Sequence, residues 1–170
     1  MTMQRVGAYD VRVSRDDRGR ARPLGEQLTE AHQALRERLA SLRHEVADGT
    51  ARPGFPADLH GYCLSFCSAV RTHHTSEDNQ VFPALSAAAP ELAPVIGKLI
   101  EDHQLVAAIL RQVRELLGPD RPPSPPAALL RELDGLTAIL ESHFSFEERR
   151  IAQALTTLDP GSIDLRLPLR

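Results

Sequence analysis

Histidine and glutamate recur in this chain at a spacing that could hold metal ions. The segment from His73 to Leu85 reads HHTSEDNQVFPAL, and His73 and Glu77 stand four residues apart within it. At about 3.6 residues per turn, residues four apart lie on one face of a helix, so an imidazole and a carboxylate can bind the same ion. The segment HFSFEE repeats this spacing with His143 and Glu147. The pattern predicts a metal site built from two helices.

Four amphipathic stretches position these residues. Their apolar side chains recur every three or four residues, as on a helix that buries one face. Prolines and glycines mark their ends, and the stretches run from Pro23 to Gly49, from Pro56 to Pro83, from Pro90 or Pro94 to Gly118, and from about Ala127 to Leu155. The second and fourth carry the pairs, while the first carries His32 and the third His103 on its apolar stripe. No strand pattern competes, so we predict an all-α, up-down-up-down four-helix bundle in which Pro83 stops or bends the second helix.

The candidate positions also agree in depth along the bundle. His32 lies about 8 residues into its helix, and His103 lies about 9 to 13 residues into the parallel third helix. His73 and His143 each lie about 17 residues into the antiparallel second and fourth helices. At a rise of about 1.5 Å per residue, the four histidines converge towards one end of the bundle.

Two carboxylates in such a core need a compensating cation. A lone histidine on an apolar stripe is more often a hydrogen-bonded core residue than a metal ligand, so His32 or His103 alone carries little weight. Glu77 and Glu147 differ, because an unpaired ion in a bundle core is strongly unfavourable. No Lys or Arg stands on the inward stripes near either glutamate. Metal ions are therefore their predicted partners.

The number and type of ligands indicate two ions. Four imidazoles and two carboxylates exceed a tetrahedral zinc site. If both glutamates bridge, each ion receives two histidines and both carboxylates, with room for solvent, an oxo or hydroxo bridge, or a small ligand. Such sites with open positions suit iron and, less often, manganese. A ferritin-like bundle would instead show Glu-x-x-His pairs, and the sequence contains none.

Length and composition set the outer limits. The chain has 170 residues, two cysteines, no tryptophan and a formal net charge of −3. We divide it into an N-terminal arm (1–22), one bundle domain (23–156) and an irregular C-terminal tail (157–170). The charge gives no argument for nucleic acid, and no apolar run approaches the about 18 residues of a membrane span. Without an apolar leader, we expect a cytoplasmic protein with reduced thiols.

The motifs together resemble those of the hemerythrin-like, or HHE cation-binding, family in its single-domain bacterial form. The resemblance covers about Leu24 to Leu155 and rests on the first-helix histidine, HHTSEDNQVFPAL, EDH and HFSFEE. It implies a non-haem di-iron centre with two Fe ions. The implied terminal ligands are His32, His73, His103 and His143, and the implied bridges are Glu77 and Glu147.

Alternatives in this ligand set stay open. His74 and Asp78 repeat the preferred spacing one residue later, and Glu148 stands at the five-residue offset that oxygen-carrying members use for their bridging aspartate. We favour Glu147 over Glu148 because an offset of four leaves about 40° between the paired side chains, against about 140° for five.

Ala107 marks a departure from the oxygen-carrying members. They place a second histidine one turn after the third-helix histidine, and this chain has Ala107 there. The site loses an imidazole and gains an open or solvent-filled position, which argues against simple reversible oxygen storage.

Three functions are consistent with these residues. We favour a di-iron protein that binds or reacts with O2, H2O2 or NO in sensing or detoxification. The second is an enzyme, either a di-iron oxidase or a catalase-like peroxidase. The third is an iron-storage or interaction protein with a structural metal. A sensor would need a partner protein, because no output module accompanies the bundle.

Several neighbouring residues carry weaker predictions. We expect Tyr62 to face inward, with core packing favoured over a role as a wall of a ligand pocket. Cys63 and Cys67 share a stripe with His60, and small core residues are favoured over a soft-metal site or a thiol sensor. Asp102, next to His103, could orient a ligand imidazole from outside the metal site, and a role as a surface carboxylate is equally favoured.

Overall fold

The chain folds into a four-helix bundle. The computed structural model describes residues 22–49, 57–117, 125–161 and 163, and these residues contain no strand. The helices are α1 (Leu24–Gly49), α2 (Ala57–Ser76), α3 (Phe82–Ala88), α4 (Ala93–Leu116) and α5 (Pro126–Leu155). The predicted all-α bundle is confirmed, and its bounds agree with the prolines and glycines of the sequence. The division into arm, bundle and tail stays a prediction, because most of the arm and of the tail lies outside the described residues.

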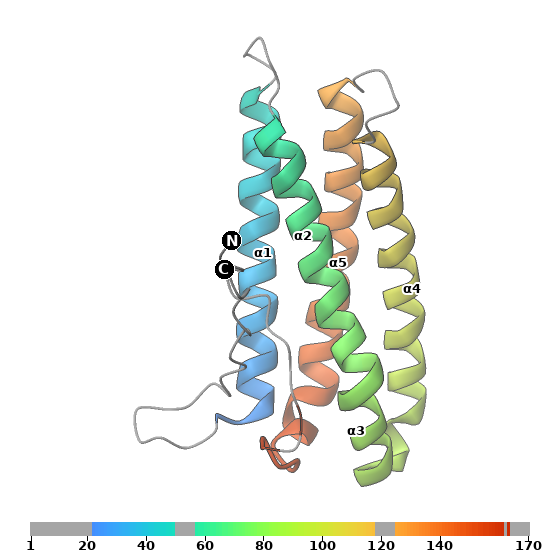
Figure 1. The fold of residues 1–170 in the computed structure, drawn as a ribbon. Helices are drawn as coiled ribbons and strands as arrows, with labels where there is room; N and C mark the ends of the chain where they lie inside the picture. Colours follow the sequence, from blue (N-terminus) through green and yellow to red (C-terminus); the bar gives the residue numbers. More distant parts are fainter. Residues whose placement is uncertain (1–21, 50–56, 118–124, 162, 164–170) are drawn as a thin grey trace, which may run out of the picture.

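The four long helical segments alternate in direction around a common core (Figure 1). α1 packs against α2 and α5, and α4 packs against the same two helices. Each long helix therefore packs against two others. These are its neighbours along the chain or, for α1 and α5, each other. None of the described helices is long and apolar enough to cross a membrane.

The second helix does not stop at Pro83. A π-helical turn, Glu77–Val81, joins α2 to α3 without a break, and the Phe82 N–H donates to the Glu77 carbonyl five residues back. Pro83 has no N–H to continue the α-helical pattern, and a wider turn before it accommodates this loss. A short 3-10 turn, Pro90–Leu92, then leads into α4.

Two apolar clusters fill the core, one towards each end of the bundle. The cluster farther from α3 contains Leu35, Phe66, Val106 and Leu133 among its buried members. The cluster nearer α3 contains, with others, Leu28, Phe82, Leu99, Ile151 and Ile163. Along the chain, six residues separate the buried members of the two clusters in α1, in α4 and in α5, and ten separate them between α2 and α3. Five of the six predicted site residues lie in these gaps, and His143 lies directly before Phe144, the last member of the first cluster on α5.

The prediction that Tyr62 faces inward is wrong, because Tyr62 is 60% exposed. The inward face of α2 includes Phe66 and His73 of the predicted stripe together with Cys63 and Cys67 of the neighbouring stripe. Tyr62 also lies near the start of α2, where its hydroxyl group can stay in water.

Gly25 allows α1 and α5 to approach closely near the polar layer. A Cβ atom added at Gly25 would lie 2.5 Å from the backbone carbonyl oxygen of Ala152, which cannot move without shifting α5. The approach lies two turns of α1 from His32. The absence of a side chain at Gly25 therefore sets the separation of two helices that carry site residues.

We expect Gly25→Ala to destabilise the fold by about 1–3 kcal/mol, because the added methyl group overpacks the α1–α5 contact. Gly135→Ala is the matched control, since nothing lies within 4 Å of a Cβ atom added there. Alanine favours the helix interior, so the control should gain about 0.5–1 kcal/mol. Urea unfolding measures both, and equal effects of the two substitutions would contradict the packing argument.

Candidate metal centre

A buried polar layer separates the two apolar clusters. All six predicted site residues lie in it, and each is at most 5% exposed. His74 joins them at 6% exposure. The members of this layer are His32, His73, His74, Glu77, His103, His143 and Glu147.

Glu77 lies between histidines of two different helices. Its Oε1 atom is 3.1 Å from Nε2 of His73, one turn away on the same chain segment. Its Oε2 atom is 3.5 Å from Nε2 of His103 on α4. The two oxygens of one carboxylate therefore face two different imidazoles, as a bridging carboxylate would.

Glu147 has the equivalent position on the opposite side of the layer. Its Oε2 atom lies 3.3 Å from Nε2 of His32 on α1 and 3.5 Å from Nε2 of His143 on α5. Each glutamate thus joins one histidine of its own helix with one from a neighbouring helix. The four predicted histidines all present Nε2 towards the two carboxylates.

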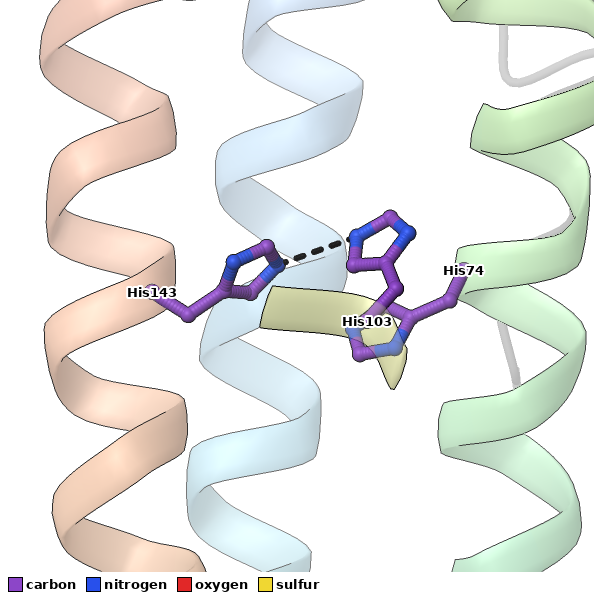
Figure 2. A group of neighbouring side chains, drawn as sticks. All are labelled: His74, His103 and His143. Atoms are coloured by element: carbon purple, nitrogen blue, oxygen red, sulfur yellow. Dashed lines mark hydrogen bonds between the residues drawn. The ribbon is translucent and has the colours of Figure 1, made fainter. Parts of the chain in front are cut away.

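The potential ligand atoms fall into two groups. One group consists of His32, His73 and Glu77, and the other of His74, His103 and His143, and within each group the ligand atoms lie within 4.8 Å of one another. Figure 2 shows the second group converging from α2, α4 and α5. There Nε2 of His103 lies 3.2 Å from Nε2 of His143, and the His74 ring stacks on that of His103 at a centroid distance of 3.9 Å. Two adjacent ions would fit two such groups.

This layer holds many polar atoms without hydrogen-bond partners. Among the described residues, nine buried side-chain nitrogen and oxygen atoms have none, and all nine belong to His32, His73, His74, Glu77, His143 and Glu147. Buried polar groups in proteins are nearly always satisfied, because an unmade hydrogen bond costs about 1–3 kcal/mol. Such a concentration of unsatisfied imidazole and carboxylate atoms fits metal ions, which take the lone pairs of both groups.

Burial disfavours the charged form of three of the imidazoles. It lowers the pKa of His73 and His74 well below the usual value, with neighbouring imidazoles adding to the shift, and it lowers the pKa of His143 to about 2. Neutral imidazoles are the form that binds metal. Burial, together with Glu147 and Asp78, raises the pKa of Glu77 well above its usual value. The described side chains therefore leave this carboxylate without a compensating cation.

A second carboxylate and an arginine fix the orientation of His32. Its Nδ1 atom lies 2.9 Å from Oε1 of Glu148, which also accepts a 3.0 Å hydrogen bond from Arg36. Burial alone would lower the pKa of His32, but contacts with Glu147 and Glu148 raise it overall. Glu148 is only partly buried and contacts the Nδ1 atom of His32, whereas Glu147 lies beside the Nε2 atom of the same ring. The structure thus places Glu147 in the layer and Glu148 behind His32.

The carboxylate behind His103 is Asp78. The Nδ1 atom of His103 lies 2.8 Å from Oδ1 of Asp78. Asp102 instead forms an ion pair with Lys98, and its other oxygen lies 3.8 Å from Nδ1 of His143, so its predicted orienting role could apply to His143 and not to His103. Asp78 belongs to the π-helical turn, which brings two successive acidic residues to neighbouring positions around the same histidine.

The two cysteines belong to the apolar core. Cys63 and Cys67 are free and buried. Burial, with a contribution from Cys67, raises the pKa of Cys63 to about 12, and burial raises the pKa of Cys67 to about 11. Neither cysteine nor His60 belongs to a group of potential metal ligands among the described residues. The favoured reading as core residues agrees with this burial, whereas a reactive thiol would need a lowered pKa.

His74 is the residue that spacing alone did not place. It stands about 100° from His73 around the helix, on the stripe of Cys63 and Cys67, and that stripe also faces inward. The histidine doublet was the available signal, because two adjacent histidines cover a wider arc of the helix than one. Only the position of α4 against α2 shows that this arc includes the site.

Comparison with known protein families gives one match. The family model described as Hemerythrin HHE cation binding domain matches residues 24–155, which is the span from the first residue of α1 to the last of α5. Comparisons with curated proteins and with solved structures gave no match.

We expect both thiols to resist alkylation in the folded protein. The reaction requires thiolate, so the raised pKa values should make modification by iodoacetamide at pH 8 roughly 100-fold or more slower than in urea. Between pH 8 and 10 the native rate should keep rising about tenfold per pH unit, while the rate in urea levels off near the ordinary thiol pKa. Mass spectrometry of quenched samples measures both rates. A native rate that levels off below pH 9 would contradict the burial argument.

Proposed function

The chain belongs to the hemerythrin HHE cation-binding domain family, and we propose that it is a non-haem di-iron protein that binds or reacts with O2, H2O2 or NO in sensing or detoxification. The observation that carries this proposal is the pair of buried carboxylates, each lying between imidazoles of two helices. Acting as a sensor would require a partner protein to receive the signal.

We assign the ligands from the side-chain positions. His32 and His73 would hold the first ion, and His103 and His143 the second, with Glu77 and Glu147 shared between them. His74 would add an imidazole to the second ion, from α2 rather than from the position of Ala107 on α4. Nine unsatisfied polar atoms and neutral imidazoles support this assignment.

Iron ions held by such ligands supply electron transfer and open coordination positions for a small molecule. The remaining work is done by the chain itself. The two apolar clusters exclude bulk water from both sides of the layer, and Glu148 and Asp78 hold the rings of His32 and His103 in fixed orientations, as metal-binding histidines generally require. The Arg36 guanidinium in turn holds Glu148.

One observation favours an enzyme as the second candidate. A cavity of about 390 Å³ between α2 and α4 is lined by His74, His103 and Ala107. A diatomic molecule or H2O2 needs far less space, so a di-iron oxidase or peroxidase with an organic substrate fits the cavity better than a carrier. Steady-state turnover of H2O2 or of an oxidisable substrate by the iron-loaded protein would establish this alternative. An iron-storage or structural role would instead give iron that shows no spectral response to small ligands.

The proposal predicts about two irons per chain after iron loading. The near-ultraviolet and visible absorption should bleach on reduction and return in air, because the ions stay accessible to a small oxidant. Glu77→Ala should lose at least one of the two irons, since it removes a ligand from both ions. His44→Ala is the control, because His44 is exposed and lies outside the layer. Full iron content in the Glu77 variant would contradict the assignment.

The contact behind His32 gives a second prediction. Glu148→Gln should weaken iron binding by about 10- to 100-fold, the usual cost of losing a carboxylate that orients a ligand histidine. Glu141→Gln is a matched control, because Glu141 also accepts a hydrogen bond from Arg36 but does not touch a histidine of the layer. Competition with a chelator of known affinity measures both. Equal affinities in the two variants would show that Glu148 has no such role.

A further inference from the structure

The cavity between α2 and α4 is wider and more charged than a channel for a diatomic molecule requires. One end reaches the second ligand group, where His74 and His103 line it. The Nε2 atom of His74 has no hydrogen-bond partner although the residue is buried. Ala107 lines the same region and leaves it open, since its side chain is a single methyl group. The cavity therefore provides a route from the surface to the polar layer.

Three exposed arginines line this cavity. Arg71 comes from α2, and Arg111 and Arg114 come from α4. Among the described residues, none of the three forms an ion pair. The one carboxylate in the described lining belongs to Asp78, which already contacts His103. An excess of unpaired guanidinium groups favours an anion, and their planar donors match the two oxygens of a carboxylate.

The order of residues along α4 separates two of the arginines from the histidines. Arg111 and Arg114 lie eight and eleven residues after His103, or about 12 and 16 Å along the helix. Arg71 lies three residues before His74, or about 4.5 Å along α2. Because α2 and α4 are antiparallel (Figure 1), all three arginines are displaced from the histidines in the same direction along the bundle. Between the two ends the cavity wall includes the apolar side chains of Ala107 and Leu110.

From this arrangement we propose that the cavity binds a small organic carboxylate. The carboxylate group contacts Arg71, Arg111 and Arg114, the apolar body lies along Ala107 and Leu110, and the far end faces His74 and His103. The volume of about 390 Å³ lies in the range of small-molecule sites. Binding in the cavity is independent of the proposed di-iron function, whereas the approach of the far end to an ion rests on it.

Calorimetric titration with benzoate tests the proposal, with benzamide as the uncharged comparison. We expect saturable binding of one benzoate per chain, at least tenfold tighter than benzamide. Arg111→Gln should weaken benzoate binding about tenfold or more, whereas Arg131→Gln, an exposed arginine of α5 outside the cavity lining, should leave it within twofold. Ala107→Leu should weaken binding by narrowing the cavity beside the histidines, with its melting temperature measured to confirm that it folds.

The proposal is overturned if benzoate shows no saturable binding at millimolar concentration, if benzamide binds equally well, or if the Arg111 and Arg131 variants behave alike. Titrating benzoate into both metal-free and iron-loaded protein shows whether its binding depends on iron. Benzoate binding to both forms supports the carboxylate site even if the iron content contradicts the di-iron assignment. A change of the iron absorption on benzoate binding would show that the ligand reaches the metal.

Discussion

The structure depends on two carboxylates buried among imidazoles. Glu77 and Glu147 are both fully buried, and no Lys or Arg of the described residues pairs with either. In a low-dielectric core an uncompensated charge is strongly unfavourable, so Glu77 is stable there only if protonated or bound to metal. The raised pKa of Glu77 favours its protonated form when no ion is bound. Membership of a cation-binding family indicates that metal ions compensate the charge. The long helices α1, α2, α4 and α5 and the π-helical turn all contribute to this layer.

The polar layer lies between two apolar clusters, and two further carboxylates contact its imidazoles from the outside. Apolar clusters lie on either side of it along the bundle axis, and Gly25 lets α1 approach α5 near His32. Behind the imidazoles, Glu148 contacts His32 and Asp78 contacts His103. The two ligand groups differ in access, because the second lies beside the cavity between α2 and α4 and the first does not line it. This asymmetry directs any incoming molecule to one side of the centre.

Periodicity in the sequence was enough to predict the fold and the place of the main site residues. His32 and His103 stand on apolar stripes, and the pairs starting at His73 and His143 stand one turn apart, so each was expected to face the core, and each is buried. The choice of Glu147 over Glu148 as a ligand followed from helix geometry alone and stays a prediction. In the structure Glu147 is fully buried, whereas Glu148 is partly exposed and contacts Nδ1 of His32.

What periodicity could not predict depends on contacts between helices. His74 and Asp78 lie about 100° from the predicted stripe, and only the position of α4 and the π-helical turn bring them against His103. Tyr62 fits the predicted stripe but lies outside the contact between α2 and its neighbours. The cavity is lined by arginines of two helices, Arg71 of α2 and Arg111 and Arg114 of α4, so the sequence pattern of one helix alone does not predict it.

Anomalous diffraction from crystals of the iron-loaded protein, recorded on both sides of the iron absorption edge, tests the central claim most directly. The account predicts two iron peaks between Glu77 and Glu147, one beside His32 and His73 and the other beside His103 and His143, with His74 ligating the second. A single peak, or iron bound away from the two glutamates, would contradict it.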